Sequence, residues 1–356
     1  MPKDSAMTLN EQKSEIFPLL QKAMELELST IPPYMTAWLS IKKNQNGYKN
    51  HVAANLIRSV MMEEMLHMLL VGNLISSLGG KVSLREDNIP TYPLTMNFTD
   101  RNFPINLMAF SREAISTFLE IEKPKEIEVS FRAFAAIDIP AVTIGEFYNE
   151  IIIRLNDMCD EFGEPAVFCG DPSKQIEQNY YWSSNGKPIV ITNKESADKA
   201  LEIIIKQGEG TDESIFIESE DYFKKSEEVA HFFRFKEIWY GRYYSPTDKP
   251  QQEPSGDPFT VDYNDVFPIK QNPKSSDYEP SSQLATLNNA FNLQYSLMLL
   301  QLEQAFNGTP SVLYHAIVNS MHSMVSIAME MMSLKISDNG DETCGAPSFE
   351  WISPPI

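Results

Sequence analysis

The chain has 356 residues, of which 42% are hydrophobic and 22% charged, a balance typical of a folded globular protein. The formal net charge of −20 disfavours nucleic acid and anionic membrane surfaces as partners, because both would repel the chain. The three cysteines show neither a disulfide framework nor a close-spaced metal pattern, and no apolar run is long enough to cross a membrane. Since the first residues also lack the pattern of a secretory signal, we expect a cytoplasmic protein without a membrane partner.

Two long helices are expected at the start of the chain. A capping box, Thr8–Glu11, begins a segment of helical periodicity, which Pro32 and Pro33 should kink or break. The second helix covers residues 52–78 and should end at Gly79–Gly80.

The middle of the chain is less regular. Residues 81–142 contain several prolines and are predicted to form a long connection with a short helix near 105–120. A third helix should run from Thr143 to about Phe162. An irregular stretch follows, with a candidate strand over 187–192 and a short helix over 197–206 that ends in the sequence Gln-Gly-Glu-Gly.

A fourth core helix is expected over residues 226–239, ending at Gly241. Residues 242–280, rich in Pro, Ser, Asp and Tyr, predict an extended segment, and two further helices should cover about 281–306 and 310–334. Several methionines gather near His315 and His322 in the last helix; we interpret the methionines as core, with a second metal site as the alternative.

Two segments carry the pattern Glu-x-x-His. Glu64 and His67 occupy the second helix, and Glu228 and His231 the predicted fourth helix. On a helix this spacing aims a carboxylate and an imidazole at one spot, so each pair could ligate one metal ion, with the carboxylate bridging to a second ion. The alternative for each pair is an ordinary hydrogen bond on a partly exposed helix face.

A two-metal site of this kind needs one further glutamate from each of the two other helices. The first helix offers Glu27 or Glu25, which lie on nearly opposite faces. The third offers Glu146, with Glu150 one turn later, although Glu146 could instead serve a capping box with Thr143. The order then predicts an all-α, ferritin-like four-helix bundle with an irregular insertion and extra C-terminal helices: residues 1–241 form the bundle, and 242–356 an extended wrap with two helices packed on it.

Six segments in order match the signature of a known family. They are Leu26–Tyr34, Glu63–Met68 with Gly79–Gly80, Thr143–Tyr148, Gln207–Gly210, Ala230–Phe235 and Gly345–Glu350. The chain resembles the ferritin-like domain of iminophenyl-pyruvate dimer synthases. The resemblance implies a place in specialised metabolism, on imines derived from amino acids. It implies as metal ligands Glu27, Glu64, His67, Glu146, Glu228 and His231.

Four carboxylates and two imidazoles suit two iron ions, and manganese or a mixed pair would also fit. The expected function is oxidation or oxidative coupling of a small imine-like substrate with O2 or peroxide. Tyr34 and Tyr148 are candidates for proton or radical transfer, against plain packing. The alternatives are a non-redox imine dimer synthase, with the metals as Lewis acids, and a ferroxidase or metal-storage protein. The sequence is compatible with an external reductant and with a homo-oligomer.

Overall fold

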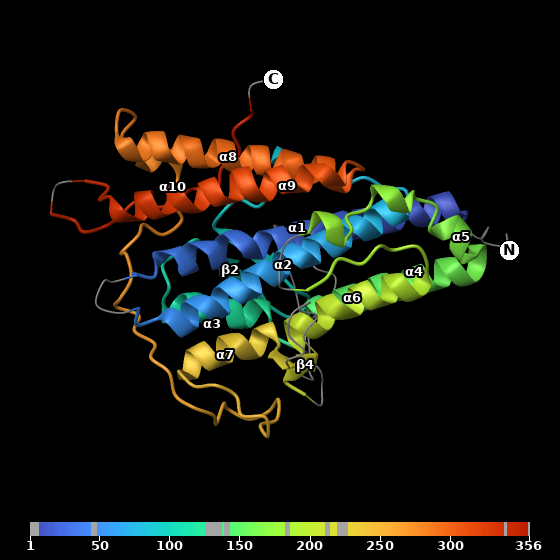
Figure 1. Ribbon diagram of the computed structural model, residues 1–356, viewed down its shortest axis with the longest axis horizontal. Coiled ribbons are helices and arrows are strands. Elements are labelled where there is room, and N and C mark those ends of the chain that lie inside the picture. Colours follow the sequence, from blue (N-terminus) through green and yellow to red (C-terminus); the bar gives the residue numbers. More distant parts are fainter. Residues whose placement is uncertain are drawn as a thin grey trace.

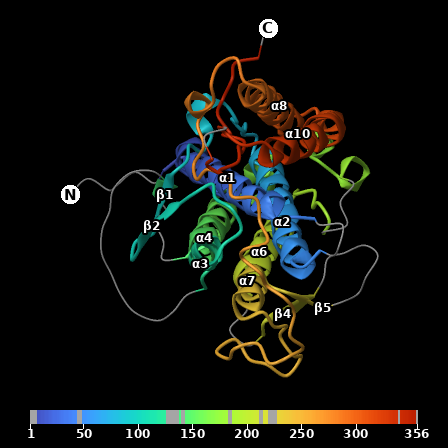
Figure 2. The same ribbon diagram turned by 90° about the vertical axis from the view of Figure 1, so that its left-hand side faces the viewer.

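The computed structural model describes residues 7–43, 48–124, 137–138, 143–181, 186–210, 214–218, 227–337 and 340–354. Most of the described residues lie in helices, which stack in three layers (Figures 1 and 2). The middle layer consists of α1 (Leu9–Ser40) and α2 (His51–Ser77), which pack along each other. Because both sides of this pair are covered by other helices, nearly every residue of α1 from Ala23 onward is buried.

Helix α1 begins with the predicted capping box, in which Thr8 and Glu11 bond each other's backbone N–H groups. Of the kink or break expected at Pro32 and Pro33, the break is wrong, because α1 continues through both prolines. Pro33 has no N–H to donate to the carbonyl of Ser29, and the hydroxyl of Tyr92 donates to that oxygen instead, at 2.7 Å. A tertiary hydrogen bond thus replaces a lost helical one.

The lower layer is formed by two rows of helices, each interrupted near the middle. One row contains α3 (Arg112–Ile121) and α4 (Ile144–Phe162), and the other α6 (Lys194–Glu209) and α7 (His231–Tyr240). Helix α4 packs on α6 at one end of the molecule, and α3 packs on α7 at the other (Figure 1). The short helix expected near 105–120 is therefore a full member of the bundle.

The predicted fourth helix over 226–239 is wrong in its first part. Residues Glu227–Val229 form strand β5, which pairs antiparallel with β4 (Phe216–Glu218), and helix α7 begins only at His231. The strand expected over 187–192 is also wrong, since these residues belong to no strand and Ile191 instead bonds the side chain of Gln175. The remaining small elements are strands β1 (Leu94–Asn97), β2 (Asn102–Ile105) and β3 (Ile137–Asp138), in the order β2-β1-β3, and helix α5 (Glu164–Val167).

The upper layer is formed by the end of the chain (Figure 2). It contains α8 (Gln283–Phe306) and, antiparallel to it, α9 (Leu313–His315), the π-helical segment η6 (Ala316–Met321) and α10 (His322–Ser333). Helix α8 packs on α2, and α10 packs on α1. The division into two domains at residue 241 stays a prediction.

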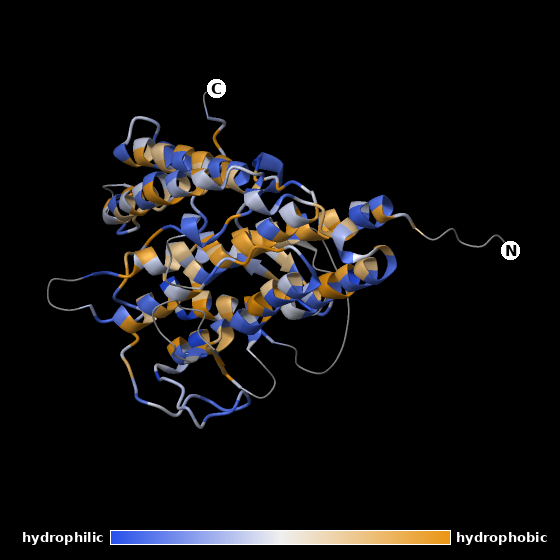
Figure 3. Cartoon of the chain, turned by 45° about the vertical axis from the view of Figure 1, so that its right-hand side comes forward, coloured by the Kyte–Doolittle hydropathy of each residue, from blue (hydrophilic) through white to orange (hydrophobic). Residues whose placement is uncertain are grey.

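The hydrophobic residues concentrate where the layers meet, and the outer segments are mostly hydrophilic (Figure 3). None of the helices in the described ranges has the length and apolar character needed to cross a membrane.

Glu237 on α7 carries a testable pH effect. Its buried carboxylate accepts the backbone N–H of Tyr244 at 2.7 Å, and burial raises its pKa to about 7. Because the folded state holds this proton more tightly than the unfolded state, the ionised group reduces stability increasingly as pH rises from about 4.5 to 7. We expect Glu237→Gln, which keeps the acceptor oxygen, to raise the unfolding free energy by roughly 2 kcal/mol at pH 8 and by much less at pH 5. Urea unfolding of metal-free protein at both pH values measures this, and an equal change at the two would contradict it.

Candidate metal centre

Five ligand-bearing side chains meet inside the bundle at the level where the two lower rows are interrupted. They form two groups that share Glu64: one consists of Glu27, Glu64 and His67, and the other of Glu64, Glu122 and His231. Within each group the ligand atoms lie within 4.8 Å of one another. All five side chains are at most 4% exposed, so solvent does not compensate their charges.

The backbone places these five residues in two different ways. Glu27, Glu64 and His67 lie in the middle of long helices, the last two one turn apart on the same face of α2. Glu122 is the C-cap of α3, and His231 is the first residue of α7. The interruptions of the lower rows therefore supply two ligands from helix ends.

Both histidines turn the same ring nitrogen toward the carboxylates. Nδ1 of His67 lies 3.3 Å from Oε2 of Glu27 and 3.8 Å from Oε1 of Glu64. Nδ1 of His231 lies 2.9 Å from Oε1 of Glu64 and 3.6 Å from Oε2 of Glu122. The two rings are nearly parallel, with centroids 5.5 Å apart, and Glu64 is the carboxylate that both Nδ1 atoms approach.

The other ring nitrogens are held by protein groups behind the site. Nε2 of His67 lies 2.8 Å from Oε1 of Gln207, and Nε2 of His231 lies 2.8 Å from Oε2 of Glu63. Glu63 also accepts from Nη1 of Arg234 at 2.9 Å. With both Nε2 atoms donating outward, each Nδ1 can offer its lone pair inward, which is the arrangement typical of metal-binding histidines.

Hydroxyl groups bond the carboxylates from outside. The Tyr148 hydroxyl donates to Oε1 of Glu27, the Tyr34 hydroxyl donates to Oε1 of Glu122 at 2.6 Å, and Thr30 donates to Oε2 of Glu64 at 3.0 Å. Burial, together with the neighbouring carboxylates, raises the pKa of both tyrosines well above its ordinary value. Both predicted tyrosines thus lie against the centre as neutral donors.

The neighbouring carboxylates of the centre repel one another, which affects the pKa of Glu64 most clearly. Burial and the charges of Glu122 and Glu27 raise the pKa of Glu64 to about 8. Burial disfavours charged imidazolium, but the bond to Glu27 and the charge of Glu64 raise the pKa of His67, and carboxylates likewise raise that of His231. Without a cation the centre therefore retains protons, which metal binding would displace.

The residues present fit a pair of metal ions. Nδ1 of His231 is buried and makes no hydrogen bond of acceptable geometry within the described residues, which is what a ligand atom facing a cation would show. The donor set combines three carboxylates with two imidazole nitrogens. Such a hard, mostly oxygen set suits iron or manganese.

The structure brings together four of the six ligands predicted from sequence: Glu27, Glu64, His67 and His231. Glu25, the alternative to Glu27, instead accepts hydrogen bonds from Gln21 and Asn88.

The other two predicted ligands lie outside both groups. Glu146 is at the start of α4, where its backbone N–H bonds the Thr143 hydroxyl, and its replacement Glu150 pairs with Arg154. Glu228 lies on strand β5, and its carboxylate is 3.6 Å from Nη2 of Arg234. The spacing Glu228-x-x-His231 therefore does not span one helix face.

Sequence reasoning missed Glu122, Gln207 and Glu209. Glu122 follows an amphipathic segment, which could have indicated a core helix ending in a ligand. Gly210, at φ +77°, does end α6 as expected for the Gln-Gly-Glu-Gly sequence, but Gln207 also supports His67. Glu209 accepts the N–H of Gly145 at 2.6 Å, and burial raises its pKa to about 7.

A helical bundle with buried carboxylates and histidines that could hold metal ions is typical of ferritin-like di-metal proteins. The family model described as Ferritin-like matches residues 20–240, and the chain belongs to that family. This confirms the predicted ferritin-like, mostly helical fold.

A crystal structure of a ferritin-like protein from Caulobacter vibrioides shares the fold, with a TM-score of 0.59. The two sequences are 19% identical, and the match covers 90% of this chain and 95% of the other. A comparison with curated proteins finds no match.

Proposed function

We propose that this protein is a non-haem di-iron enzyme that oxidises or oxidatively couples a small, amino-acid-derived substrate with O2 or peroxide. The observation that carries the proposal is the sharing of Glu64 between two buried groups, each completed by one histidine Nδ1. One ion would be held by Glu27, Glu64 and His67, and the other by Glu64, Glu122 and His231, with Glu64 bridging. We assign to Glu122 the role that the sequence suggested for Glu146.

Iron bound there would supply the electron exchange with O2 or peroxide, and manganese would fit the same donors. The chain's own residues fix the geometry. Gln207 and Glu63 hold the two imidazole rings by their Nε2 atoms, which sets the direction of each Nδ1 lone pair.

Two tyrosines hold protons at the ligand carboxylates. The Tyr148 hydroxyl keeps a proton at Oε1 of Glu27, and the Tyr34 hydroxyl keeps one at Oε1 of Glu122. Because their pKa values are raised, both stay protonated at neutral pH and remain hydrogen-bond donors to the carboxylates. We propose this proton-holding role for both.

The substrate class rests on the resemblance to iminophenyl-pyruvate dimer synthases, whose relatives act on imines from amino acids. Two alternatives share every ligand: a non-redox imine dimer synthase with Lewis-acid metals, and a ferroxidase or storage protein.

The test starts with metal-free protein loaded anaerobically with Fe(II), on which we expect about two iron ions per chain by plasma mass spectrometry. An α-keto acid and ammonium, which condense reversibly to the α-imino acid with loss of water, are added before O2. The expected result is O2 consumption that depends on both iron and the imine, with an oxidised or coupled product by mass spectrometry.

Each alternative gives a different result. Anaerobic turnover with Zn(II) would favour the non-redox synthase. Fe(II) oxidation without substrate, by a large shell seen in light scattering, would favour the ferroxidase. Less than half an ion per chain after loading would contradict the two-metal assignment itself.

A further inference from the structure

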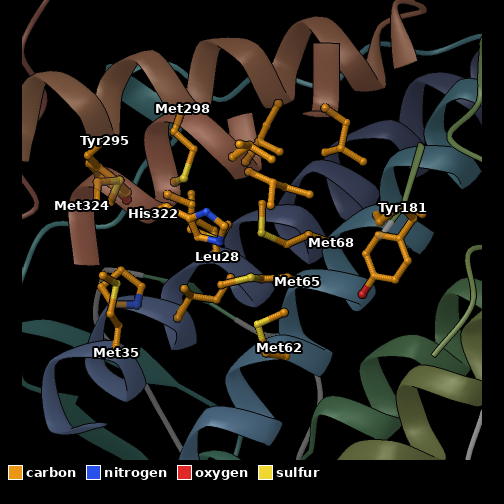
Figure 4. Close-up of a pocket in the computed structure, with 18 of the residues that line it drawn as sticks. Leu28, Met35, Met62, Met65, Met68, Tyr181, Tyr295, Met298, His322 and Met324 are labelled. Carbon is orange, nitrogen blue, oxygen red and sulfur yellow. The ribbon is translucent and has the colours of Figure 1, made fainter. Parts of the chain in front are cut away.

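A cavity lies away from the metal centre, between the middle and upper layers (Figure 4). It has a volume of about 370 Å³ and is enclosed by α1 and α2 on one side and by α8, η6 and α10 on the other. This volume falls in the range of small-molecule sites. Methionines from four helices and the π-helical segment line much of it: Met35, Met62, Met65, Met68, Met298, Met321 and Met324.

The cavity is separate from the metal centre, because the two use different faces of α2. Arg58, Met62 and Met65 recur at helical spacing along the face that lines the cavity. Glu64 and His67 lie on the other side of the same helix. The proposal below therefore stands whether or not the proposed function holds.

The lining has the character of a ligand site. Unbranched methionine side chains adapt to varied apolar shapes, so a methionine-rich wall accepts a flexible apolar molecule. The π-helical turns of Ala316–Met321 contribute Ile317, Val318 and Met321, and such turns occur often at functional sites. Of the methionines expected to be core in the last helix, Met331 and Met332 are fully buried, whereas Met321 and Met324 line the cavity.

One polar group inside lacks a partner. The hydroxyl of Tyr295, a residue 1% exposed, makes no hydrogen bond within the described part of the chain. An unsatisfied buried hydroxyl is costly, so the position favours a ligand atom that can accept its proton. Figure 4 shows Tyr295 from α8 and His322 from α10 on the same side of the cavity, near Met324.

The charges of the lining favour an anion. Of the described residues that line the cavity, Arg58 and His322 can carry positive charge and none is a carboxylate. In a chain of net charge −20 this is a locally positive and apolar environment. Arg58 and His322 are both exposed, so they stand where a ligand would enter.

We propose that this cavity binds an elongated, apolar monocarboxylate. The apolar chain lies among the methionines, and the carboxylate faces Tyr295 and His322, with Arg58 supplying attraction at the entrance. Each methylene buried should tighten binding about threefold to fourfold, since a buried CH2 contributes about 0.8 kcal/mol.

The probe is dodecanoate, titrated calorimetrically into the full chain below its micelle-forming concentration, with and without iron. We expect saturable binding of one molecule per chain, weaker for decanoate and weaker again for octanoate. Dodecanol, which has the same chain but no charge, should bind at least tenfold more weakly. Absence of saturable binding, or equal affinity for the acid and the alcohol, would overturn the proposal.

Three variants test the site. Val318→Trp, at a position 37% exposed, should obstruct the cavity and weaken the acid and the alcohol alike. Arg58→Gln should weaken dodecanoate about tenfold and leave dodecanol unchanged. Tyr295→Phe should weaken dodecanoate without lowering the melting temperature of the ligand-free protein, because the lost hydroxyl had no partner.

A purely structural role for Tyr295 would instead lower the melting temperature and leave the affinity unchanged. The control is Glu64→Gln, which alters only the metal centre and should bind dodecanoate as the natural chain does. If Val318→Trp and Arg58→Gln both leave dodecanoate binding unchanged, the fatty acid binds elsewhere and the site is refuted.

Discussion

Replacing Glu64 by glutamine is expected to abolish the binding of both metal ions, with affinities reduced by more than about 100-fold. Glu64 is the one side chain that both ligand groups contain, and the amide has no charge to bridge two cations. The same change should raise the melting temperature of the metal-free protein at pH 8. The pKa of Glu64 is raised to about 8, so its ionisation reduces stability as pH rises from about 4.5 to 8.

The prediction is specific because Glu64→Gln should weaken metal binding and, at the same time, stabilise the metal-free protein. Metal content by plasma mass spectrometry and thermal unfolding with and without Fe(II) measure both. Glu146→Gln and Glu228→Gln are matched controls, because the same substitution at positions outside both groups should leave about two ions per chain. If Glu146→Gln loses metal while Glu64→Gln keeps it, the assignment to these two groups is wrong.

Replacing Arg234 by methionine is expected to lower the unfolding free energy by about 3–5 kcal/mol. Arg234 is 4% exposed and bonds Glu63 at 2.9 Å, while Glu63 is 1% exposed and bonds His231. Although burial opposes it, the charge of Arg234 holds the pKa of Glu63 at about 2. Without the guanidinium, Glu63 remains as a buried charge with poor compensation, which is the costly half of a broken ion pair.

Urea unfolding of metal-free protein measures this loss of stability. Two further variants show whether it comes from the Arg234–Glu63 pair or from the Arg234–Glu228 pair. The double variant Arg234→Met with Glu63→Gln should recover part of the loss, because position 63 then no longer carries an uncompensated charge. Glu228→Gln removes the more exposed partner of Arg234, at 3.6 Å, and should cost less than about 1 kcal/mol.

The pKa of Glu63 is depressed, so the loss of unfolding free energy in Arg234→Met should shrink as pH falls from about 4.5 toward 2. A loss below 1 kcal/mol in the single variant at pH 7 would refute the buried-pair account.

Most of the helices and four of the five residues of the centre could be predicted, and three of these four depend on local signals within continuous helices. Glu64 and His67 share a helix turn, and a capping box marks the start of α1. Helix geometry alone shows that at most one of Glu25 and Glu27 can point into the bundle, because residues two apart lie on nearly opposite faces. These inferences hold wherever a helix is continuous.

Glu122 was not predicted, and Glu228 was predicted on the wrong grounds, because both depend on where helices start and stop. The letters Glu-x-x-His recur at Glu228, but pairing with β4 keeps residues 227–229 in a strand, where the spacing no longer aligns the side chains. Glu122 was not predicted as a ligand because the ten-residue helix before it lies among prolines, so its sequence resembles a connection rather than a core helix. Tertiary packing against α7 makes that short helix part of the bundle.

The origin of Glu122 and His231 at helix ends has a consequence for engineering the protein. Moving a ligand in the middle of α1 or α2 along the axis means sliding a packed helix, in steps of about 5.4 Å per turn. A ligand at the last or first residue of a helix can instead be shifted by lengthening or shortening the adjoining connection, while the core contacts stay in register. Redesign of the spacing between the two metal positions should therefore start from the segments after Ile121 and before His231.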